Sequence, residues 1–464
     1  MSDAPRKVAI IGLDCAEPTL IFERWRALLP NLSRLMQAGV YGELRSSHPP
    51  ITVPAWSSMM TSKDPGQLGF YGFRNRADHS YDKLSIANST AVKADTAWDI
   101  LSRQGKHVIL LGVPQTYPPK PINGVVVTDF LTPSIESQYT YPAGLKDEIK
   151  SWVGNYMLDV PDFRTEDKAR LLRDIYEMSR QRFEVARRLL TSRPWDFFMM
   201  VEMGLDRIHH GFWKYMDKNH PKYEAGNPYE NAIRDYYVYV DGLIGELLPL
   251  FDDDTVVLVV SDHGAMKMDG GFCINEWLIQ EGYLAVKEYP AQPTKMEKVP
   301  IDWPRTLAWG EGGYYARLFL NVKGREPQGA IEPARYEAVR DEIIAKLQAV
   351  RDHQGKPMGN VVLKPEQIYA ETRNVPPDLI IYFGGLNWRS VGSIGSRQIY
   401  TFENDTGPDD ANHSPEGICI VYDPRRQIGR QVRHQWQLMD IAPTVLRLMG
   451  SPVPADMRGA AIII

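Results

Sequence analysis

The stretch Val8-Ala9-Ile10-Ile11-Gly12-Leu13-Asp14 decides the fold class of this chain of 464 residues. Its apolar run lacks polar alternation, which is typical of a short strand buried on both faces of a parallel sheet. Asp14 follows at the point where the strand should end. Because functional groups of parallel sheets gather at the carboxyl ends of the strands, Asp14 is the first candidate site residue.

Similar apolar runs recur along the chain, and helical patterns separate several of them. This alternation predicts an α/β fold with a doubly wound, mainly parallel sheet flanked by helices. The further expected strands are 108–111, 124–129, 197–201, 255–260, 379–382 and 417–421, and the expected helices are 97–103, 166–192 and 228–251.

Two regions interrupt this rhythm and predict segments that cover the site. Residues 132–162 are rich in Pro, Ser and Tyr, and residues 289–309 contain four prolines with little periodicity. Such segments are typical of surface loops that carry function. We therefore expect a catalytic core of residues 1–288 and 366–464, an inserted lid of residues 289–365, and a second candidate lid segment at 132–162.

Composition narrows the classes of partner and the cellular compartment. The net charge of −5 gives no general reason to bind a nucleic-acid polymer or an anionic membrane. No apolar stretch is long enough to span a membrane. Three cysteines form no disulfide framework and favour a reducing, cytoplasmic location. A small phosphorylated substrate would need a local positive centre, such as a metal ion, and homo-oligomerisation stays open.

Polar residues with metal-binding chemistry recur at defined places in the pattern. Asp262-His263-Gly264 ends an apolar strand, as Asp14 does. Asp206 and His210 are four residues apart and would share a helix face, which selects His210 over His209. Taken singly, each has an ordinary structural reading as a cap, a loop residue or a surface ion pair. The full candidate set is Asp14, Thr52, Asp206, His210, Asp262, His263 and His413.

Together these residue types meet one chemical requirement. Two metal ions about 4 Å apart can neutralise the attacking and the leaving oxygen of an in-line displacement at phosphorus. Mixed Asp and His ligands suit zinc, although manganese accepts similar sets. A threonine hydroxyl such as that of Thr52 is a poor nucleophile at neutral pH unless its pKa is lowered.

The order of these motifs resembles the alkaline phosphatase superfamily. The order is Asp, Thr in a proline-rich turn, Asp-x3-His, Asp-His-Gly and His. Within the superfamily the chain is similar to the type I phosphodiesterase and nucleotide pyrophosphatase branch, and to the broader group of predicted phosphohydrolases and phosphomutases. Residues 52–61 match the nucleophile turn, and residues 440–446 are similar to the closing helix of this superfamily.

The resemblance implies a role for each candidate. Asp206, His210 and His413 would hold one zinc ion, and Asp14, Thr52, Asp262 and His263 would hold the other. Thr52 would attack phosphorus and form a covalent phospho-threonine intermediate.

The sequence departs from the family pattern at the expected phosphate contact. Relatives carry an Asn shortly after the nucleophile turn, and here that position falls on Phe73. Arg74 and Asn75 are the neighbouring candidates for substrate binding, and the choice between them stays open.

These observations favour a zinc-dependent phosphodiesterase acting on a small phosphodiester or pyrophosphate. The same site could serve a phosphomonoesterase, a phosphonate hydrolase or a phosphomutase, because a fold does not settle function. A non-catalytic, metal-binding member of the superfamily is a further alternative, which a metal count below two per chain would indicate.

Overall fold

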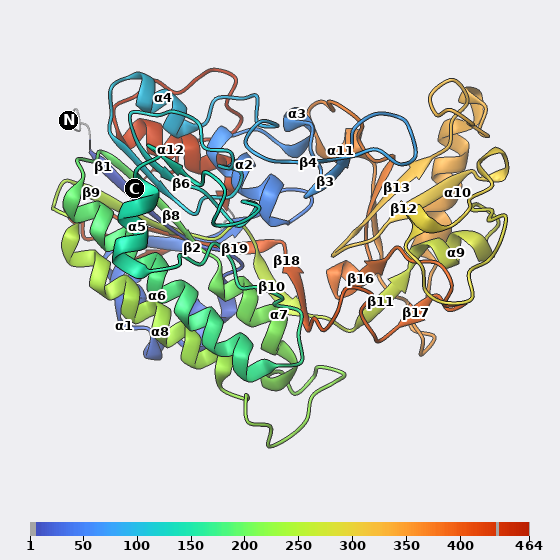
Figure 1. Cartoon of the computed structure of the whole chain (residues 1–464), viewed down its shortest axis with the longest axis horizontal. Helices are drawn as coiled ribbons and strands as arrows, with labels where there is room; N and C mark the ends of the chain where they lie inside the picture. The colour runs from blue at the N-terminus through green and yellow to red at the C-terminus, as the bar shows by residue number, and fades with distance from the viewer. Residues whose placement is uncertain (1–5, 433–435, 464) are drawn as a thin grey trace.

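A large twisted sheet forms the centre of the larger unit of the molecule, at the left in Figure 1. The computed structural model describes residues 6–432 and 436–463. Strand β1 pairs in parallel with β8 and β9, and β5 pairs in parallel with β8 and β6. The predicted doubly wound, mainly parallel sheet is therefore confirmed. These five strands are β1 (Lys7–Leu13), β5 (Val108–Leu111), β6 (Gly124–Val127), β8 (Phe197–Glu202) and β9 (Thr255–Val260).

Five outer strands of mixed direction complete this sheet, and β2 pairs in parallel with β20 and β21. The order is β20-β2-β19-β9-β1-β8-β5-β6-β7, with β21 beside β2. β19 runs antiparallel to β9 and β2, and β7 runs antiparallel to β6. The outer strands are β2 (Val40–Arg45), β7 (Thr140–Tyr141), β19 (Glu416–Tyr422), β20 (Arg430–Gln431) and β21 (Trp436–Gln437).

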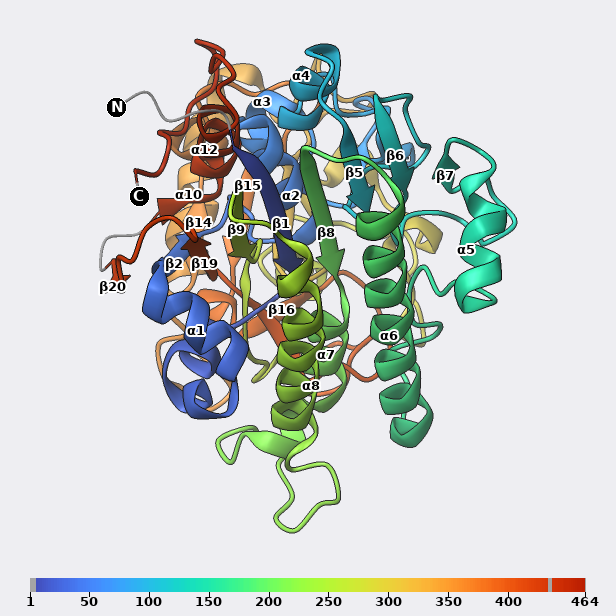
Figure 2. The same ribbon diagram turned by 90° about the vertical axis from the view of Figure 1, so that its left-hand side faces the viewer.

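Helices cover both faces of the sheet, as Figures 1 and 2 show. One face packs against α1 (Pro30–Ala38), α6 (Lys168–Ser192), α7 (Gly204–Met216) and α8 (Ala232–Leu247). The other packs against α2 (Thr52–Thr61), α4 (Ala97–Arg103) and α12 (Ile441–Leu448). β1 lies between these layers, and Val8, Ile10 and Ile11 are fully buried, as its uninterrupted apolar sequence requires.

A second unit has its own sheet and its own hydrophobic core. Its antiparallel sheet has the order β12-β13-β15-β14, and α9 and α10 pack against it. The core extends from Phe272 to Ile394, so the unit is wider at both ends than the expected insertion of residues 289–365. The elements are β12 (Ala308–Glu311), β13 (Ala316–Leu320), β14 (Val361–Leu363), β15 (Leu379–Tyr382), α9 (Ile274–Gln280) and α10 (Tyr336–Gln348).

The strand expected at 379–382 exists, but its placement in the main parallel sheet was wrong. As β15 it pairs antiparallel with β13 and β14 in the second unit. A short, fully apolar run reads the same in either sheet, because both of its faces are buried in each case.

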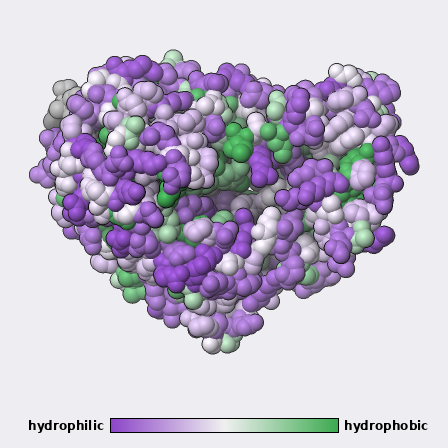
Figure 3. Space-filling model, in the orientation of Figure 1, coloured by the Kyte–Doolittle hydropathy of each residue, from purple (hydrophilic) through white to green (hydrophobic). Residues whose placement is uncertain are grey.

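Short elements link the two units. Strands β10 (Gly264–Lys267) and β18 (Ala411–Ser414) pair antiparallel, with Ala265 opposite His413. Figure 3 shows the surface hollowed between the units. The remaining elements are β3 (Arg74–Arg76), β4 (Leu84–Ile86), β11 (Gly270–Cys273), β16 (Trp388–Val391), β17 (Tyr400–Thr401), α3 (Pro65–Leu68), α5 (Leu145–Val153) and α11 (Pro365–Ile368).

The segment 132–162 packs mainly against the core of the main sheet. It contains β7 and α5, and Tyr139, Leu145 and Ile149 are buried in that core. Its last residues reach the hollow, where Asp159 lines the cavity described below.

Among the helices that the structure describes, none has the length and apolarity needed to cross a membrane.

Candidate metal centre

The fold brings all seven predicted ligand and nucleophile residues to one buried place. Asp14 directly follows β1, and Asp262 and His263 follow the end of β9; helix α7 carries Asp206 and His210, and β18 carries His413. Thr52 is the first residue of α2. All seven are at most 3% exposed. The six Asp and His residues form two groups whose ligand atoms lie within 4.8 Å of one another.

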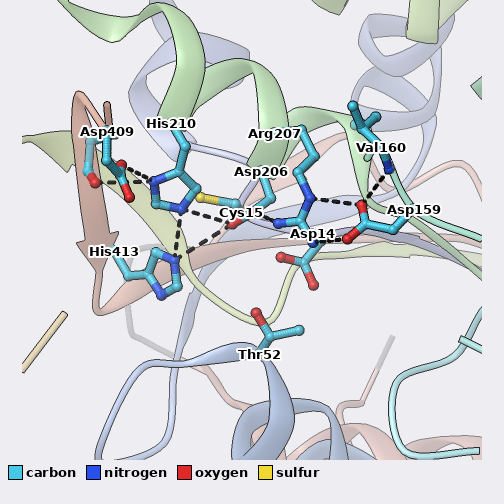
Figure 4. Close-up of polar contacts among 12 residues, drawn as sticks. Asp14, Cys15, Thr52, Asp159, Val160, Asp206, Arg207, His210, Asp409 and His413 are labelled. Atoms are coloured by element: carbon cyan, nitrogen blue, oxygen red, sulfur yellow. Dashed lines mark hydrogen bonds and ion pairs between the residues drawn. The ribbon is translucent and has the colours of Figure 1, made fainter. Parts of the chain in front are cut away.

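The first ligand group consists of Asp206, His210 and His413 (Figure 4). The Nε2 atoms of the two histidines are 3.2 Å apart. Asp206 Oδ1 lies 3.2 Å from His210 Nε2 and 3.5 Å from His413 Nε2. Three potential ligand atoms from a helix and a distant strand therefore converge on one point.

The second ligand group consists of Asp14, Asp262 and His263. His263 Nε2 lies 3.1 Å from Asp262 Oδ2 and 3.8 Å from Asp14 Oδ1. The other carboxylate oxygens are held in place, because the Trp56 indole N–H donates to Asp14 Oδ2 and the Cys15 backbone N–H donates to Asp262 Oδ1. Each carboxylate thus keeps one oxygen directed to the group.

The outer contacts of the three histidines fit a role as metal ligands. Nδ1 of His210 lies 2.7 Å from Asp409 Oδ1, Nδ1 of His413 lies 3.0 Å from the Pro50 carbonyl, and Nδ1 of His263 lies 3.1 Å from the Gly264 carbonyl. An acceptor at Nδ1 fixes the proton there and leaves Nε2 free to bind a metal ion.

The carboxylates show the same fit. Asp14 Oδ1, Asp206 Oδ1 and Asp262 Oδ2 are buried and lack a hydrogen bond to any described residue. Leaving a buried carboxylate oxygen unpaired is costly, so these atoms need a cation. They are also the atoms that face the histidine nitrogens. The residues present therefore fit two divalent cations, one at each ligand group.

The two groups differ in their electrostatics. Burial and the nearby Asp206 raise the pKa of Asp262, and burial and Asp262 raise that of Asp14. Burial alone would also raise the pKa of Asp206, but the charges of His210 and Arg207 hold it well below its usual value. Burial opposes protonation of His210, yet Asp409 and Asp206 raise its pKa to about 9.

Thr52 begins a helix rather than lying in a loop. Ile51 is extended, with φ −142° and ψ 140°, and the chain then enters α2 with Pro54 in its first turn, where a missing N–H costs nothing. The Thr52 hydroxyl lies 3.4 Å from His263 Nε2. The N-terminus of a helix carries partial positive charge and unpaired N–H groups, which suit a phosphate.

A cavity of about 390 Å³ opens from Thr52 toward the second unit. The first ligand group also lines it, so a bound molecule would contact Thr52 and that metal site together. Its aromatic wall comes from both units and consists of Phe73, Phe130, Phe163, Tyr314 and Tyr315.

The two predicted substrate contacts lie in different surroundings. Arg74 lines the cavity. Asn75 is 6% exposed, and its amide bonds within its own loop: Oδ1 accepts from the Tyr71 backbone N–H, and Nδ2 donates to the Gly72 carbonyl. Asn75 is not among the lining residues of the cavity.

Sequence reasoning missed three charged residues of the centre. Asp409 contacts His210, Arg207 contacts Asp206, and Asp159 contacts Arg207. Arg207 follows Asp206 directly and could have been noticed. Asp159 and Asp409 come from irregular segments that only the folded chain brings to the site.

Comparison with solved structures shows that the fold extends over nearly the whole chain. Phosphonoacetate hydrolase from Sinorhizobium meliloti, solved with phosphonoacetate, is 16% identical with a TM-score of 0.60, covering 96% of each chain. Murine ectonucleotide pyrophosphatase / phosphodiesterase 5, solved with AMP as an inactive threonine-to-alanine variant, is 12% identical with a TM-score of 0.52. That alignment covers 97% of this chain and 96% of the murine one.

A curated relative matches over a much shorter stretch. The 2,3-bisphosphoglycerate-independent phosphoglycerate mutase of Pseudomonas fluorescens is 36% identical over 62 residues. These residues are 13% of this chain and 12% of the mutase.

A family model establishes the wider relationship. The model described as type I phosphodiesterase / nucleotide pyrophosphatase matches residues 8–409, which include six of the seven predicted site residues. His413 lies just beyond the match and is joined to it by the pairing of β18 with β10. The chain therefore belongs to the type I phosphodiesterase / nucleotide pyrophosphatase family, whose members are metal-dependent phosphoester hydrolases of the alkaline phosphatase superfamily.

Proposed function

We propose that this protein is a two-metal phosphodiesterase that uses Thr52 as its nucleophile. Its substrate would be a small phosphodiester or pyrophosphate. The observation that carries the proposal is the placement of Thr52, whose hydroxyl lies 3.4 Å from a residue of the second ligand group and lines one cavity with the first.

The donor sets favour zinc. The first ligand group offers two histidine nitrogens and one carboxylate, a combination common at zinc sites. The second offers one histidine and two carboxylates, which manganese also accepts. When bound, the two ions would lower the pKa of the Thr52 hydroxyl and of water and would neutralise charge on the phosphoryl oxygens.

The chain itself supplies the nucleophile and its orientation. Thr52 Oγ would lose its proton to solvent and form a bond to phosphorus as the bond from phosphorus to the leaving oxygen breaks, and the leaving oxygen would take up a proton from solvent. Water would then form a bond to phosphorus and release Thr52. The first backbone N–H groups of α2 have no acceptor within the helix and would bind a non-bridging oxygen. The inactive threonine variant of the murine structure supports a threonine in this role.

The cavity supports a small substrate. Its volume of about 390 Å³ lies in the range of small-molecule sites. Its aromatic residues would hold an apolar or aromatic leaving group, with Arg74 as an anion contact.

All three cysteines are free and buried, in keeping with the proposed cytoplasmic location.

The test compares kcat/KM for an aryl phosphodiester and the matching aryl phosphomonoester with zinc-loaded protein. We expect a diester preference of about 100-fold, which corresponds to about 2.7 kcal/mol of differential transition-state binding. Both activities should be lost in Thr52→Ala. A monoester preference would overturn the diesterase assignment and would instead support a phosphomonoesterase on the same site.

A further inference from the structure

Arg207 occupies a special position at the junction of the two ligand groups. It is 6% exposed and lines the same cavity as Thr52. Its Nη1 donates to Asp206 of the first group, and its charge also acts on Asp14 of the second. Figure 4 shows the guanidinium beside Asp159, with the Asp14 carboxylate between it and Thr52 in this view.

The orientation of this guanidinium is fixed from two directions. Asp159 accepts from Nε at 2.8 Å and from Nη2 at 2.7 Å, a bidentate pair. The Phe163 ring lies 4.4 Å from the guanidinium carbon. The bonds to Asp159 and Asp206 use three of the five N–H groups of an arginine, so one on Nη1 and one on Nη2 are left to donate.

Arg207 makes more contacts than it would need if it only supported the metal ligand Asp206. Neutralising Asp206 takes one hydrogen bond, and Asp159 balances the arginine charge at the cavity wall. A rigid fork with two open donors matches two oxygens of a phosphoryl group in geometry and in charge. Preorganised donors of this kind are effective because they need no reorientation while charge develops.

We infer that Arg207 is a catalytic residue that donates to the non-bridging oxygens of the reacting phosphoryl group, and that Asp159 is its positioning residue. The inference rests on the proposed function. As the bond between Thr52 Oγ and phosphorus forms and the bond to the leaving group breaks, negative charge grows on those oxygens. The open N–H groups stabilise it and keep their protons, so Arg207 takes no part in proton transfer.

The first experiment compares Arg207→Lys with wild type in zinc-loaded protein. Lysine keeps the positive charge but lacks the planar pair of N–H donors of the guanidinium. We therefore expect kcat to fall about 100-fold while KM changes less than about threefold. The inhibition constant of orthovanadate, which adopts the geometry of the transition state, should rise about as much as kcat falls. That of inorganic phosphate should change much less, because a ground-state ligand gains less from these donors. Zinc content should stay at two per chain.

Two further variants separate catalysis from structure. Arg207→Ala should regain part of its kcat on addition of guanidinium ion, which can fill the space left by the side chain. Asp159→Asn keeps Arg207 but weakens its clamp, so kcat should fall about tenfold at unchanged KM, without rescue by guanidinium. The matched control is Arg325→Lys, since Arg325 makes a similar two-point pair with Asp378 in the second unit and does not line the cavity. Its kcat should stay within about threefold of wild type.

Defined outcomes would overturn the inference. An Arg207→Lys enzyme that binds two zinc ions and keeps its kcat would remove the catalytic role. A loss of activity that excess zinc restores would show that Arg207 only supports metal binding. If Arg207→Lys does not fold, unchanged kinetics of Asp159→Asn would contradict the inference. Failure of the proposed function is distinct, because wild type itself would then hydrolyse no aryl phosphodiester.

Discussion

The first ligand group is in direct contact with charged partners, whereas Arg207 acts on Asp14 of the second group only through its charge. Asp206 contacts Arg207 and His210, and His210 in turn contacts Asp409. In the second group, Asp14 and Asp262 are fully buried; burial and Asp262 raise the pKa of Asp14, and burial and Asp206 raise that of Asp262. Their partners are neutral: the Trp56 indole and the Cys15 backbone N–H.

Two bound metal ions would therefore have different structural tasks. At the first group, the protein already neutralises much of the carboxylate charge, and an ion would add to these contacts. At the second, an ion would be the main counter-charge for two buried acids. Buried charges need such a partner, so the second group should depend more strongly on its metal for stability.

The largest expected effect comes from removing a histidine ligand from either group. His210→Ala and His263→Ala should each lower kcat by at least ~10³-fold, since a bound metal contributes several kcal/mol to the transition state. Each variant should bind one zinc ion instead of two, measured by elemental analysis after desalting. Two tightly bound ions in either variant would break the division into two groups.

Stability of the metal-free protein should differ between the groups. Asp206→Asn removes one of the two carboxylates that contact each of Arg207 and His210, and it should lower the free energy of unfolding by about 3 kcal/mol. Asp262→Asn removes a repelling acid and keeps an acceptor for Cys15, so it should stay within ~1 kcal/mol of wild type or above it. Urea unfolding in the presence of a chelator measures both. Equal destabilisation by the two variants would contradict the electrostatic contrast.

The smallest difference between the two groups should come from the residues that hydrogen-bond to the ligands without belonging to the ligand groups themselves. Asp409→Asn weakens the charged partner of His210 and should reduce zinc affinity at the first group by about 10- to 100-fold. Trp56→Phe removes one neutral hydrogen bond to Asp14 and should reduce affinity at the second group by less than about tenfold. Competition with a chromogenic chelator measures both affinities. A larger loss in Trp56→Phe would reverse the proposed order.

Site residues at strand ends could be predicted from the sequence, because the apolar run that forms the strand directly precedes the functional residue. The apolar runs before Asp14 and Asp262 fix both carboxylates at the same edge of the sheet. Helical spacing placed Asp206 and His210 on one face in the same way. These four positions follow from elementary periodicity.

Other parts depend on contacts between distant segments. His413 reaches the site through the pairing of β18 with β10, and only the family resemblance indicated it. The start of α2 at Thr52 was hidden by Pro50 and Pro54, which read as a turn although proline is tolerated in a first helical turn. The clamp of Arg207 by Asp159 spans 48 residues and leaves no local pattern.

We propose above that Thr52 becomes covalently attached to the phosphoryl group during turnover. The most direct measurement is rapid acid quenching of the zinc-loaded enzyme with an aryl phosphodiester, followed by peptide mass spectrometry. We expect a phosphoester adduct on Thr52 that is absent in Thr52→Ala. Full turnover without an adduct, an adduct on another residue, or an active Thr52→Ala enzyme would contradict it.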